Sequence, residues 1–357
     1  MYPALAVVEA LAPGEDAVLW VGGQGGMEAN LIQRAGIPFD AIPAAGVHGV
    51  GIARLPGNLL RLLRGWFKSR RILAHFKPDA LLFTGGYVAV PMALAALGRP
   101  KLLFVPDIEP GLALKVLSRF ANWITLTVDE TRAYLPKGKG ATVTGYPLRK
   151  SLVRTNPPAA RAHFGLRDDL PVVMVMGGSQ GAHTINQVIF RHLSNLLDDC
   201  QMIHITGTTD SEAAEHARQS LPADKQERYL HFGYLHEEMG IALSCAQLVI
   251  SRAGASTLGE YPAYELPAVL VPYPFAWRYQ TMNAEYLAAR GAAILMPDAE
   301  MDAQMVAIVH DLLQDPNRLA SMSIAMHALS RPDAAGRIAD LVRKLAEGHP
   351  LPAEEQA

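Results

Sequence analysis

Residues 171–190 read PVVMVMGGSQGAHTINQVIF, and this stretch decides the fold class. A short apolar run passes through a glycine-containing turn into apolar residues at helical spacing. This order is typical of the βα unit of a parallel sheet. The glycines allow a ligand to approach the backbone closely, and the start of the helix offers free N–H groups to a phosphate. A tight turn without a ligand is the alternative, because one glycine loop is weak evidence.

The same alternation of short apolar runs and longer amphipathic runs extends along the whole chain. It predicts two successive doubly wound α/β folds, each with a parallel sheet. The longest helix is expected at Asn58–His75. The expected strands are Ala17–Val21, Phe39–Ile42, Ala80–Thr84, Leu102–Val105, Trp123–Thr127 and Thr142–Thr144, then Pro171–Met176, Met202–Thr206, Tyr229–Phe232, Leu248–Ser251, Ala268–Val271 and Ala293–Met296.

Length and composition divide the chain into domains. Its 357 residues exceed the ~250–300 that a single core usually reaches. Proline and charge concentrate between Tyr146 and Pro171, as in a linker. We therefore predict a first domain at 1–150, a second at 151–332, and a C-terminal helix and tail at 333–357 that packs back on the first domain. Two such domains are expected to face a cleft at the carboxyl ends of their sheets, where ligands bind in these folds.

Composition argues against several classes of protein. With 34 acidic and 32 basic residues, the net charge of −2 disfavours a nucleic-acid partner. Two cysteines give no disulfide framework, and the histidines lack metal-ligand spacing. The longest apolar stretch, Val88–Leu97, is shorter than the ~20 residues of a membrane span. The composition therefore predicts a cytoplasmic protein that at most rests on a membrane.

A second glycine-containing loop follows the strand expected at Leu248–Ser251. Residues 251–260 read SRAGASTLGE, so small residues again lead into a helix. The backbone N–H groups from Ala255 to Leu258 can bind a diphosphate. Glu260, about one turn inside, can bind the two hydroxyls of a ribose. Alternatively, Glu260 only complements the dipole of the helix.

Three further junctions carry candidate binding residues. Gln280 and Asn283 share one helical face and offer amides to a sugar, although Asn283 can instead cap or pack at a domain seam. Gly85-Gly86-Tyr87 forms another strand–glycine–helix junction. Arg149 follows the last strand of the first half, where it can bind a phosphate or form a surface ion pair.

The segment Arg54–Lys77 is amphipathic and basic, with Trp66 and Phe67 among its apolar residues. Such a segment can lie on an anionic membrane surface. The alternative is a helix that packs on the core and exposes a basic face to water.

The chain opens directly with a helix that starts near Pro3. A βαβ domain normally begins with a strand and a loop that lead into such a helix. We therefore expect the sequence to be a truncated reading of a longer protein whose first strand and glycine-rich loop precede Met1. On this expectation the 357-residue form is unstable and nearly inactive, because a missing strand leaves its neighbours with unpaired backbone groups.

Together these junctions resemble the MurG family, the bacterial lipid I N-acetylglucosaminyltransferases. They follow the order and spacing of that family over almost the whole chain. The resemblance implies a GT-B fold, in which the first domain binds the acceptor and the second the donor. The matching segments are Tyr2–Ala6, Gly85–Val88, Gly145–Arg149, Gly177–Ala182, Ile250–Ala255 with Glu260, and Gln280 with Asn283 and Ala284.

The resemblance also implies an activity. An inverting, metal-independent and cofactor-free reaction would move GlcNAc from UDP-GlcNAc to the C4 hydroxyl of the MurNAc unit of lipid I. The product, lipid II, serves peptidoglycan synthesis at the cytoplasmic face of the cell membrane. The implied partners are UDP-GlcNAc, lipid I and an anionic membrane surface, with other cell-wall synthesis proteins as further candidates. The alternatives are a GT-B enzyme with another lipid acceptor and a catalytically idle UDP-GlcNAc-binding protein.

Site residues carry over from the family position by position. The resemblance implies that the region Ile241–Leu243 flanks the uracil and that Glu260 binds the ribose. It also implies that Gln280 contacts the GlcNAc and that Arg149 reaches the donor from the first domain. Asp107 stands where the family has an asparagine that contacts the donor sugar. The family's candidate catalytic histidine belongs to the loop before Tyr2, so no catalytic base is assigned here. The diphosphate is assigned to Ser179 and to the backbone of Ala255, Ser256, Thr257, Leu258 and Gly259, and the acceptor to Gly85, Gly86 and Tyr87.

Overall fold

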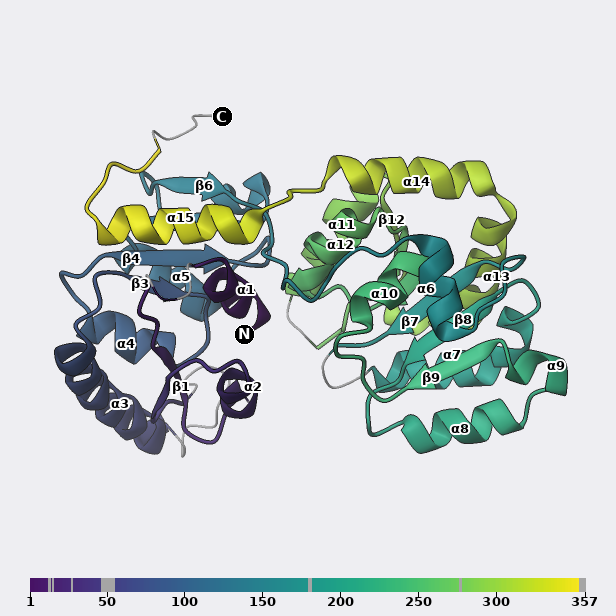
Figure 1. Cartoon of the computed structure of the whole chain (residues 1–357), viewed down its shortest axis with the longest axis horizontal. Helices are drawn as coiled ribbons and strands as arrows, with labels where there is room; N and C mark the ends of the chain where they lie inside the picture. Colours follow the sequence, from purple (N-terminus) through teal and green to yellow (C-terminus); the bar gives the residue numbers. More distant parts are fainter. Residues whose placement is uncertain are drawn as a thin grey trace. The chain divides into compact units, whose positions relative to one another are not determined.

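The computed structural model describes residues 1–11, 14, 16–26, 28–45, 55–178, 182–275 and 278–352. The chain forms two compact units (Figure 1). Unit 1 consists of Met1–Arg149 together with the C-terminal helix α15 (Ala334–Ala346), and unit 2 consists of Lys150–Pro332.

Unit 1 is an α/β fold in which every strand pairing is parallel. Strands β1 and β2 form one sheet, and β3, β4, β5 and β6 form a second in that order. The elements are α1 (Tyr2–Ala10), β1 (Trp20–Gly23), α2 (Glu28–Arg34), β2 (Phe39–Ile42), α3 (Leu55–Phe76), β3 (Leu81–Phe83), α4 (Ala89–Ala95), β4 (Lys101–Val105), α5 (Leu112–Phe120), β5 (Trp123–Leu126), the 3₁₀ turn η2 (Asp129–Tyr134) and β6 (Ala141–Val143).

The centre of unit 1 is strand β4, whose five side chains are all buried. Both α5 and α15 pack against β4, and α15 also packs against α1. The Arg343 guanidinium of α15 donates to the Asp16 carboxylate at 2.8 Å, and Arg337 donates to the backbone oxygen of Thr144 at 2.5 Å. The C-terminal helix is therefore part of unit 1.

One expected strand of unit 1 differs from the prediction. The sequence predicts a strand at Ala17–Val21, whereas β1 begins at Trp20 and ends at Gly23. The partner strand sets these bounds, because Trp20 pairs with Phe39 and its N–H donates to the carbonyl of Pro38. The residues before Trp20 have no partner on β2, so the ladder starts later than the apolar run.

Unit 2 contains one six-stranded parallel sheet with the order β12-β11-β10-β7-β8-β9. The strands that the sequence predicts for this half all occur, with ends within one residue of the prediction. The elements are α6 (Pro157–Phe164), β7 (Val172–Met176), α7 (His183–Leu196), β8 (Gln201–Ile205), α8 (Ser211–Gln219), α9 (Ala223–Gln226), β9 (Tyr229–Phe232), α10 (Met239–Cys245), β10 (Leu248–Ser251), η3 (Ala255–Leu258), α11 (Glu260–Tyr264), β11 (Ala268–Leu270), α12 (Tyr279–Ala289), β12 (Ala293–Leu295), η4 (Asp298–Glu300), α13 (Met301–Gln314) and α14 (Pro316–Ala328).

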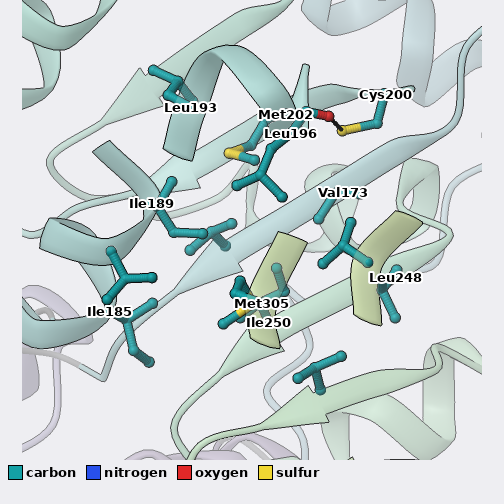
Figure 2. Packing of buried hydrophobic residues seen from close by; sticks show 14 of the residues in the cluster. Val173, Ile185, Ile189, Leu193, Leu196, Cys200, Met202, Leu248, Ile250 and Met305 are labelled. Carbon is teal, nitrogen blue, oxygen red and sulfur yellow. Dashed lines mark hydrogen bonds between the residues drawn. The ribbon is translucent and has the colours of Figure 1, made fainter. Parts of the chain in front are cut away.

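The core of unit 2 explains why α7 lies on the sheet. Its apolar residues recur every three or four positions, so they form one face that packs on the strands. Each fully buried side chain of this kind contributes about 1.5–3 kcal/mol. Figure 2 shows this face beside residues of β7, β8, β10 and α13: Ile185, Ile189, Leu193 and Leu196 with Val173, Met202, Ile250 and Met305.

Candidate functional site

The strand order of unit 2 creates a topological switch point between β7 and β10. The chain proceeds from β7 to β8 and β9 on one side, then crosses to β10, β11 and β12 on the other. Ligands in open parallel sheets bind outside the carboxyl ends of the strands at this point. Met176 and Ser251, the last residues of the two strands, lie opposite each other. Both glycine-containing loops predicted as ligand-binding therefore leave the sheet at its switch point.

The first of these loops is only partly described. It begins with Gly177 and Gly178 and leads into α7, which starts at His183. Ser179, the predicted diphosphate ligand of this loop, lies outside the described residues. Its role therefore stays a prediction.

The second loop forms the 3₁₀ turn η3 in place of the expected continuous helix. The N–H of Thr257 donates to the carbonyl of Gly254 at 3.0 Å, and the N–H of Gly259 donates to the carbonyl of Ser256 at 3.0 Å. The N–H groups of Ala255 and Ser256 precede these bonds, as the first donors of a helical turn do. Among the predicted backbone ligands of this loop, these two are the best placed for a phosphate.

Glu260 begins α11, so its carboxylate lies in the first turn of that helix. The sequence places Glu260 about one turn inside a helix that starts earlier. The difference arises because Gly259 ends the 3₁₀ turn and a separate helix follows it. The residue Glu260 as a whole is partly buried.

Side chains from neighbouring helices hold the second loop in place. Asn283 of α12 is fully buried, and its side-chain amide donates to the carbonyl of Ala253 at 3.1 Å. The Tyr261 hydroxyl donates to Ser251 Oγ at 2.7 Å. Asn283 therefore holds the second loop in place from within unit 2, and its contact with a sugar stays a prediction.

Gln280 lies one turn before Asn283 on α12, and α12 packs against η3. The Gln280 carboxamide oxygen accepts the N–H of Tyr273 at 2.8 Å. This bond holds the Gln280 carboxamide next to Tyr273, and its contact with the GlcNAc stays a prediction.

The most connected residue of this region is Arg252, whose role the sequence does not reveal. It directly follows β10 and is only 8% exposed. Its guanidinium lies 5.2 Å from the centre of the Tyr273 ring. Its hydrogen bonds reach the ends of β11, α7 and η4: the carbonyls of Val271 and Pro272 at 3.2 and 3.3 Å, the hydroxyl of Thr184, and the carboxylate of Asp298.

These bonds tie four segments together at the carboxyl edge of the sheet. A charge directly after a buried strand is the only sequence signal for this role. Asp298 lies 46 residues away in the sequence, and no local spacing predicts the pairing. Because the Arg252 guanidinium is buried and bonds to all of these segments, we infer that it holds the loops of the candidate site in their positions.

A second polar network holds the start of α7 to β8. His204 is fully buried between the Tyr229 hydroxyl at 2.9 Å and the Asn186 side-chain oxygen at 3.0 Å. The Asn186 amide donates to the Asp210 carboxylate at 2.7 Å, and Asp210 also binds His183 Nδ1 at 2.9 Å. Because Asn186 offers an oxygen to His204, the tautomer that fits carries its proton on Nε2. The network therefore holds His183, the first residue of α7.

Burial makes this network sensitive to acid. Desolvation, with a smaller effect of the nearby His231, lowers the pKa of His204 from 6.5 to about 3. The unfolded state therefore binds one more proton than the folded state between these values, so stability falls as pH drops below 6.5. At pH 5 we expect a loss of about 2 kcal/mol from this group, at about 1.4 kcal/mol per pH unit.

The test compares urea denaturation of the parent with that of His204→Gln at pH 7 and pH 5. Glutamine retains a donor and an acceptor but is not protonated in this range. We expect the variant to lose less stability than the parent between the two pH values. The same loss in both proteins would show that His204 does not control it.

The candidate acceptor residues lie at the end of β3 in unit 1. Gly85 and Gly86 have φ angles of +103° and +85°, which side-chain-bearing residues rarely adopt. Tyr87, which follows them, is exposed. The structure thus presents a glycine turn and an aromatic ring at one strand end, and the acceptor contact stays a prediction.

Two predicted donor-binding residues also belong to unit 1. The Arg149 guanidinium lies 4.1 Å from the centre of the Tyr2 ring, so it stacks on α1. Asp107 follows β4, and its backbone oxygen accepts a hydrogen bond from Thr131 at 3.5 Å. Their donor contacts stay predictions.

No group of three or more His, Cys, Asp or Glu side chains in the described part of the chain is arranged to hold a metal ion. Metal independence of the reaction stays a prediction that chelation can test.

Comparison with known proteins links this geometry to a family. The glycosyltransferase family 28 N-terminal domain matches residues 1–125, and the C-terminal domain of the same family matches residues 172–338. A protein of Roseiflexus sp. (strain RS-1), named UDP-N-acetylglucosamine–N-acetylmuramyl-(pentapeptide) pyrophosphoryl-undecaprenol N-acetylglucosamine transferase, is 37% identical, with 97% of this chain and 92% of that protein covered. A Desulforudis audaxviator protein of the same name is also 37% identical, with 97% and 95% covered.

A solved structure agrees with these matches. The crystal structure of Acinetobacter baumannii MurG superposes with a TM-score of 0.73 at 26% identity, with 96% of this chain and 95% of that chain covered. The resemblance drawn from the ordered sequence motifs is therefore confirmed. The chain belongs to glycosyltransferase family 28 and, within it, to the MurG family, and it has the GT-B fold.

Proposed function

We propose that this protein transfers GlcNAc from UDP-GlcNAc to N-acetylmuramyl-(pentapeptide) pyrophosphoryl-undecaprenol, which is lipid I, and so forms lipid II for peptidoglycan synthesis. The proposal rests on the similarity of this chain, over 97% of its length, to proteins that are named as N-acetylglucosamine transferases acting on this acceptor. The switch-point loops of unit 2 support it, because ligands of open parallel sheets bind at such a point and a UDP-sugar can be accommodated there.

In unit 2 the leaving diphosphate is the group to be stabilised, because it gains negative charge as the glycosidic bond breaks. The N–H groups of Ala255 and Ser256 and the start of α7 carry partial positive charge at the switch point. Fixed dipoles of this kind stabilise developing charge without reorganising. They allow the reaction to proceed without a metal ion, so we expect EDTA to leave the rate unchanged.

The remaining donor contacts follow from side-chain chemistry. The Glu260 carboxylate can accept hydrogen bonds from both ribose hydroxyls, and charge-assisted bonds of this type are among the stronger ones. The Gln280 NH2 group can donate to a sugar oxygen, because its carboxamide oxygen is held by Tyr273. Unit 1, with the Gly85–Gly86 turn, is left to bind the acceptor.

Acceptor dependence tests the proposed function. We expect the purified protein to release UDP from UDP-GlcNAc only when lipid I is present, and at the same rate with EDTA. Faster UDP release with another polyprenyl-linked sugar would favour a GT-B enzyme with a different acceptor. UDP-GlcNAc binding by calorimetry without UDP release on any acceptor would favour an idle binding protein.

We further propose that α3 attaches the protein to an anionic membrane surface. Three sides of this helix differ: one packs on the core, one is basic, and one exposes apolar side chains. Exposed apolar residues beside basic ones suit the headgroup region of a bilayer. The apolar side includes Leu59, Leu60, Leu63 and Phe67, which are 48–65% exposed, and the basic side includes Arg61, Arg64 and Arg71.

No helix in the described ranges is long and apolar enough to cross a membrane. The attachment that we propose through α3 is peripheral and partly electrostatic, and it brings unit 1 near a lipid substrate.

Reversing Arg61, Arg64 and Arg71 to glutamate is expected to weaken binding to anionic vesicles at least about a hundredfold, at about 1 kcal/mol per basic residue. Lys68 is left unchanged because it forms an ion pair with Asp40 at 3.0 Å and so helps to hold α3 on the fold. Sedimentation with phosphatidylglycerol vesicles measures the effect, and added salt should imitate it.

A matched control reverses three exposed basic residues of unit 1 outside α3, Arg34, Arg119 and Lys137. It changes the net charge equally, so we expect it to weaken vesicle binding much less. Equal effects of the two triple variants would contradict a specific role for α3.

A further inference from the structure

A histidine–carboxylate pair lies at the start of α7, next to the first glycine-containing loop. His183 is the first residue of α7, and its Nδ1 atom lies 2.9 and 3.1 Å from the two carboxylate oxygens of Asp210. Asp210 comes after β8, the strand that pairs with β7. Both residues therefore lie at the carboxyl edge of the sheet, where ligands of open parallel sheets bind.

The two partners differ in exposure. Asp210 is only 7% exposed, and the Asn186 amide also donates to its carboxylate at 2.7 Å. The side chain of His183, in contrast, is 70% exposed. Because an ionised carboxylate only accepts hydrogen bonds, the ring that fits donates its Nδ1–H to Asp210. In the described part of the chain no hydrogen bond reaches the other ring nitrogen, Nε2, so it is accessible to a ligand.

The position of His183 in α7 directs its ring toward the switch point. Side chains of a helix lean toward its N-terminus, so this ring leans toward the loop that leads into α7. The next residue, Thr184, bonds to Arg252, which follows β10 on the other side of β7. The first turn of α7 is thus bonded to residues that follow both neighbours of β7, and the ring lies at the edge where the donor diphosphate is expected.

The charge of the His183 ring decides what Nε2 can bind. A neutral ring with its proton on Nδ1 has a lone pair at Nε2, which repels a phosphate oxygen, whereas an imidazolium has an N–H there. The start of a helix disfavours a cation, but the Asp210 carboxylate offsets this effect.

Other titratable or charged groups surround α7 on neighbouring elements. Of the described groups, Asp210 alone hydrogen-bonds to His183. The others are His204 of β8, Arg252 after β10, Asp298 of η4, Glu212, Glu215, His216 and Arg218 of α8, and Asp302, His310 and Asp311 of α13.

We propose that His183 binds the diphosphate of the nucleotide-sugar donor through Nε2 as an imidazolium, so that donor binding takes up a proton. This role rests on the proposed function and adds a titratable cation to the backbone N–H groups of the second loop. Asp210 is the positioning residue, because it orients the ring and favours its charged form. Donor affinity therefore falls as the pH rises, since the proton that accompanies binding becomes scarcer.

Calorimetric titration of the full chain with UDP-GlcNAc, without an acceptor, tests this role. The phosphates of UDP-GlcNAc have no proton that titrates between pH 6 and pH 8, so a proton taken up in this range is bound by the protein. Titrations in buffers of different ionisation enthalpy measure this uptake. The variant is His183→Gln. The control is His310→Gln, because His310 also pairs through Nδ1 with a carboxylate, that of Asp199 at 2.6 Å, but at the other end of α7.

We expect the parent and His310→Gln to take up protons on binding at pH 7, and to bind about tenfold more weakly at pH 8 than at pH 6. His183→Gln should take up none and should bind equally at both pH values. At pH 6 it should bind about tenfold more weakly than the parent, because it lacks a charge-assisted hydrogen bond. Asp210→Asn removes the charge that favours the imidazolium, so its affinity should fall at a lower pH than that of the parent.

Two outcomes separate this role from the proposed function. If the parent binds UDP-GlcNAc and His183→Gln has the same affinity, proton uptake and pH dependence, His183 does not bind the diphosphate, and the proposed function is unaffected. If the parent does not bind UDP-GlcNAc, both are wrong. An unchanged pH profile in Asp210→Asn would overturn the positioning role of Asp210.

Discussion

Replacing Arg252 with alanine is expected to lower the free energy of unfolding of unit 2 by about 3–5 kcal/mol, because it removes one partner of a buried ion pair. The Asp298 carboxylate is left without its cation, and the carbonyls of Val271 and Pro272 lose a donor. The loops at the switch point then lose the contact that joins them. We therefore also expect UDP-GlcNAc binding to fall below detection by calorimetry.

Two further variants separate the ion pair from the remaining bonds of Arg252. Asp298→Asn removes only the negative charge, so it should cost less than Arg252→Ala. Arg252→Lys retains the positive charge but not the fork of donors, so it should be intermediate. Urea denaturation followed by circular dichroism measures all three. If Arg252→Ala unfolds like the parent, Arg252 does not organise the site.

Replacing Glu260 with glutamine is expected to weaken UDP-GlcNAc binding about tenfold to a hundredfold. A charge-assisted hydrogen bond contributes about 1.5–3 kcal/mol, and each 1.4 kcal/mol is a factor of ten in affinity. The variant should fold normally, because Glu260 is only partly buried. Calorimetric titration with UDP-GlcNAc and with UDP measures the loss, which should be similar for both because both contain the ribose.

Glu212 provides the control for the effect of the helix dipole. It lies in the first turn of α8, as Glu260 lies in the first turn of α11, and it is exposed. Glu212→Gln should leave UDP-GlcNAc binding unchanged and alter the melting temperature slightly. If Glu260→Gln behaves in the same way, the dipole explanation is correct and the ribose contact is not.

The sequence predicts the strands and loops of unit 2 well, because each depends on local patterns. Apolar runs such as Leu248–Ser251 are buried on both faces and are bounded by small residues, so their periodicity is plain. Small residues also mark the strand ends: Gly177 directly follows Met176, and Ala253 and Gly254 come soon after Ser251. The βα order alone predicts that both loops lie at the carboxyl ends of their strands. The strand order, which puts the switch point between β7 and β10, comes from the structure.

The sequence alone does not predict contacts between residues that are far apart in the chain. The partners of Arg252 come from three other elements, and the chain of hydrogen bonds around His204 connects β8, β9 and α7. No periodicity encodes such pairings, since they depend on how the elements pack. The 3₁₀ turn before Glu260 was missed because Gly259 is compatible with either a continuous or a broken helix.

In unit 1, too, the sequence predicts a strand but not where the strand begins and ends. The apolar run Ala17–Val21 indicates a strand correctly, but the bounds of β1 depend on its partner Phe39. The sequence left two interpretations of α3 open: a helix that lies on an anionic membrane, and a helix that packs on the core and exposes only a basic face to water. The exposure of Leu59, Leu63 and Phe67 favours the membrane over a helix with only a basic solvated face.

The most direct test of the central claim is a single-turnover transfer measurement. The protein is held in excess over UDP-GlcNAc labelled in the GlcNAc unit, so that even slow chemistry is detected, and lipid I is supplied in anionic vesicles. We predict that the label moves into the lipid fraction as lipid II, with one UDP released for each GlcNAc transferred. Label that remains in UDP-GlcNAc, or that appears as free sugar while lipid I is unchanged, would contradict the account.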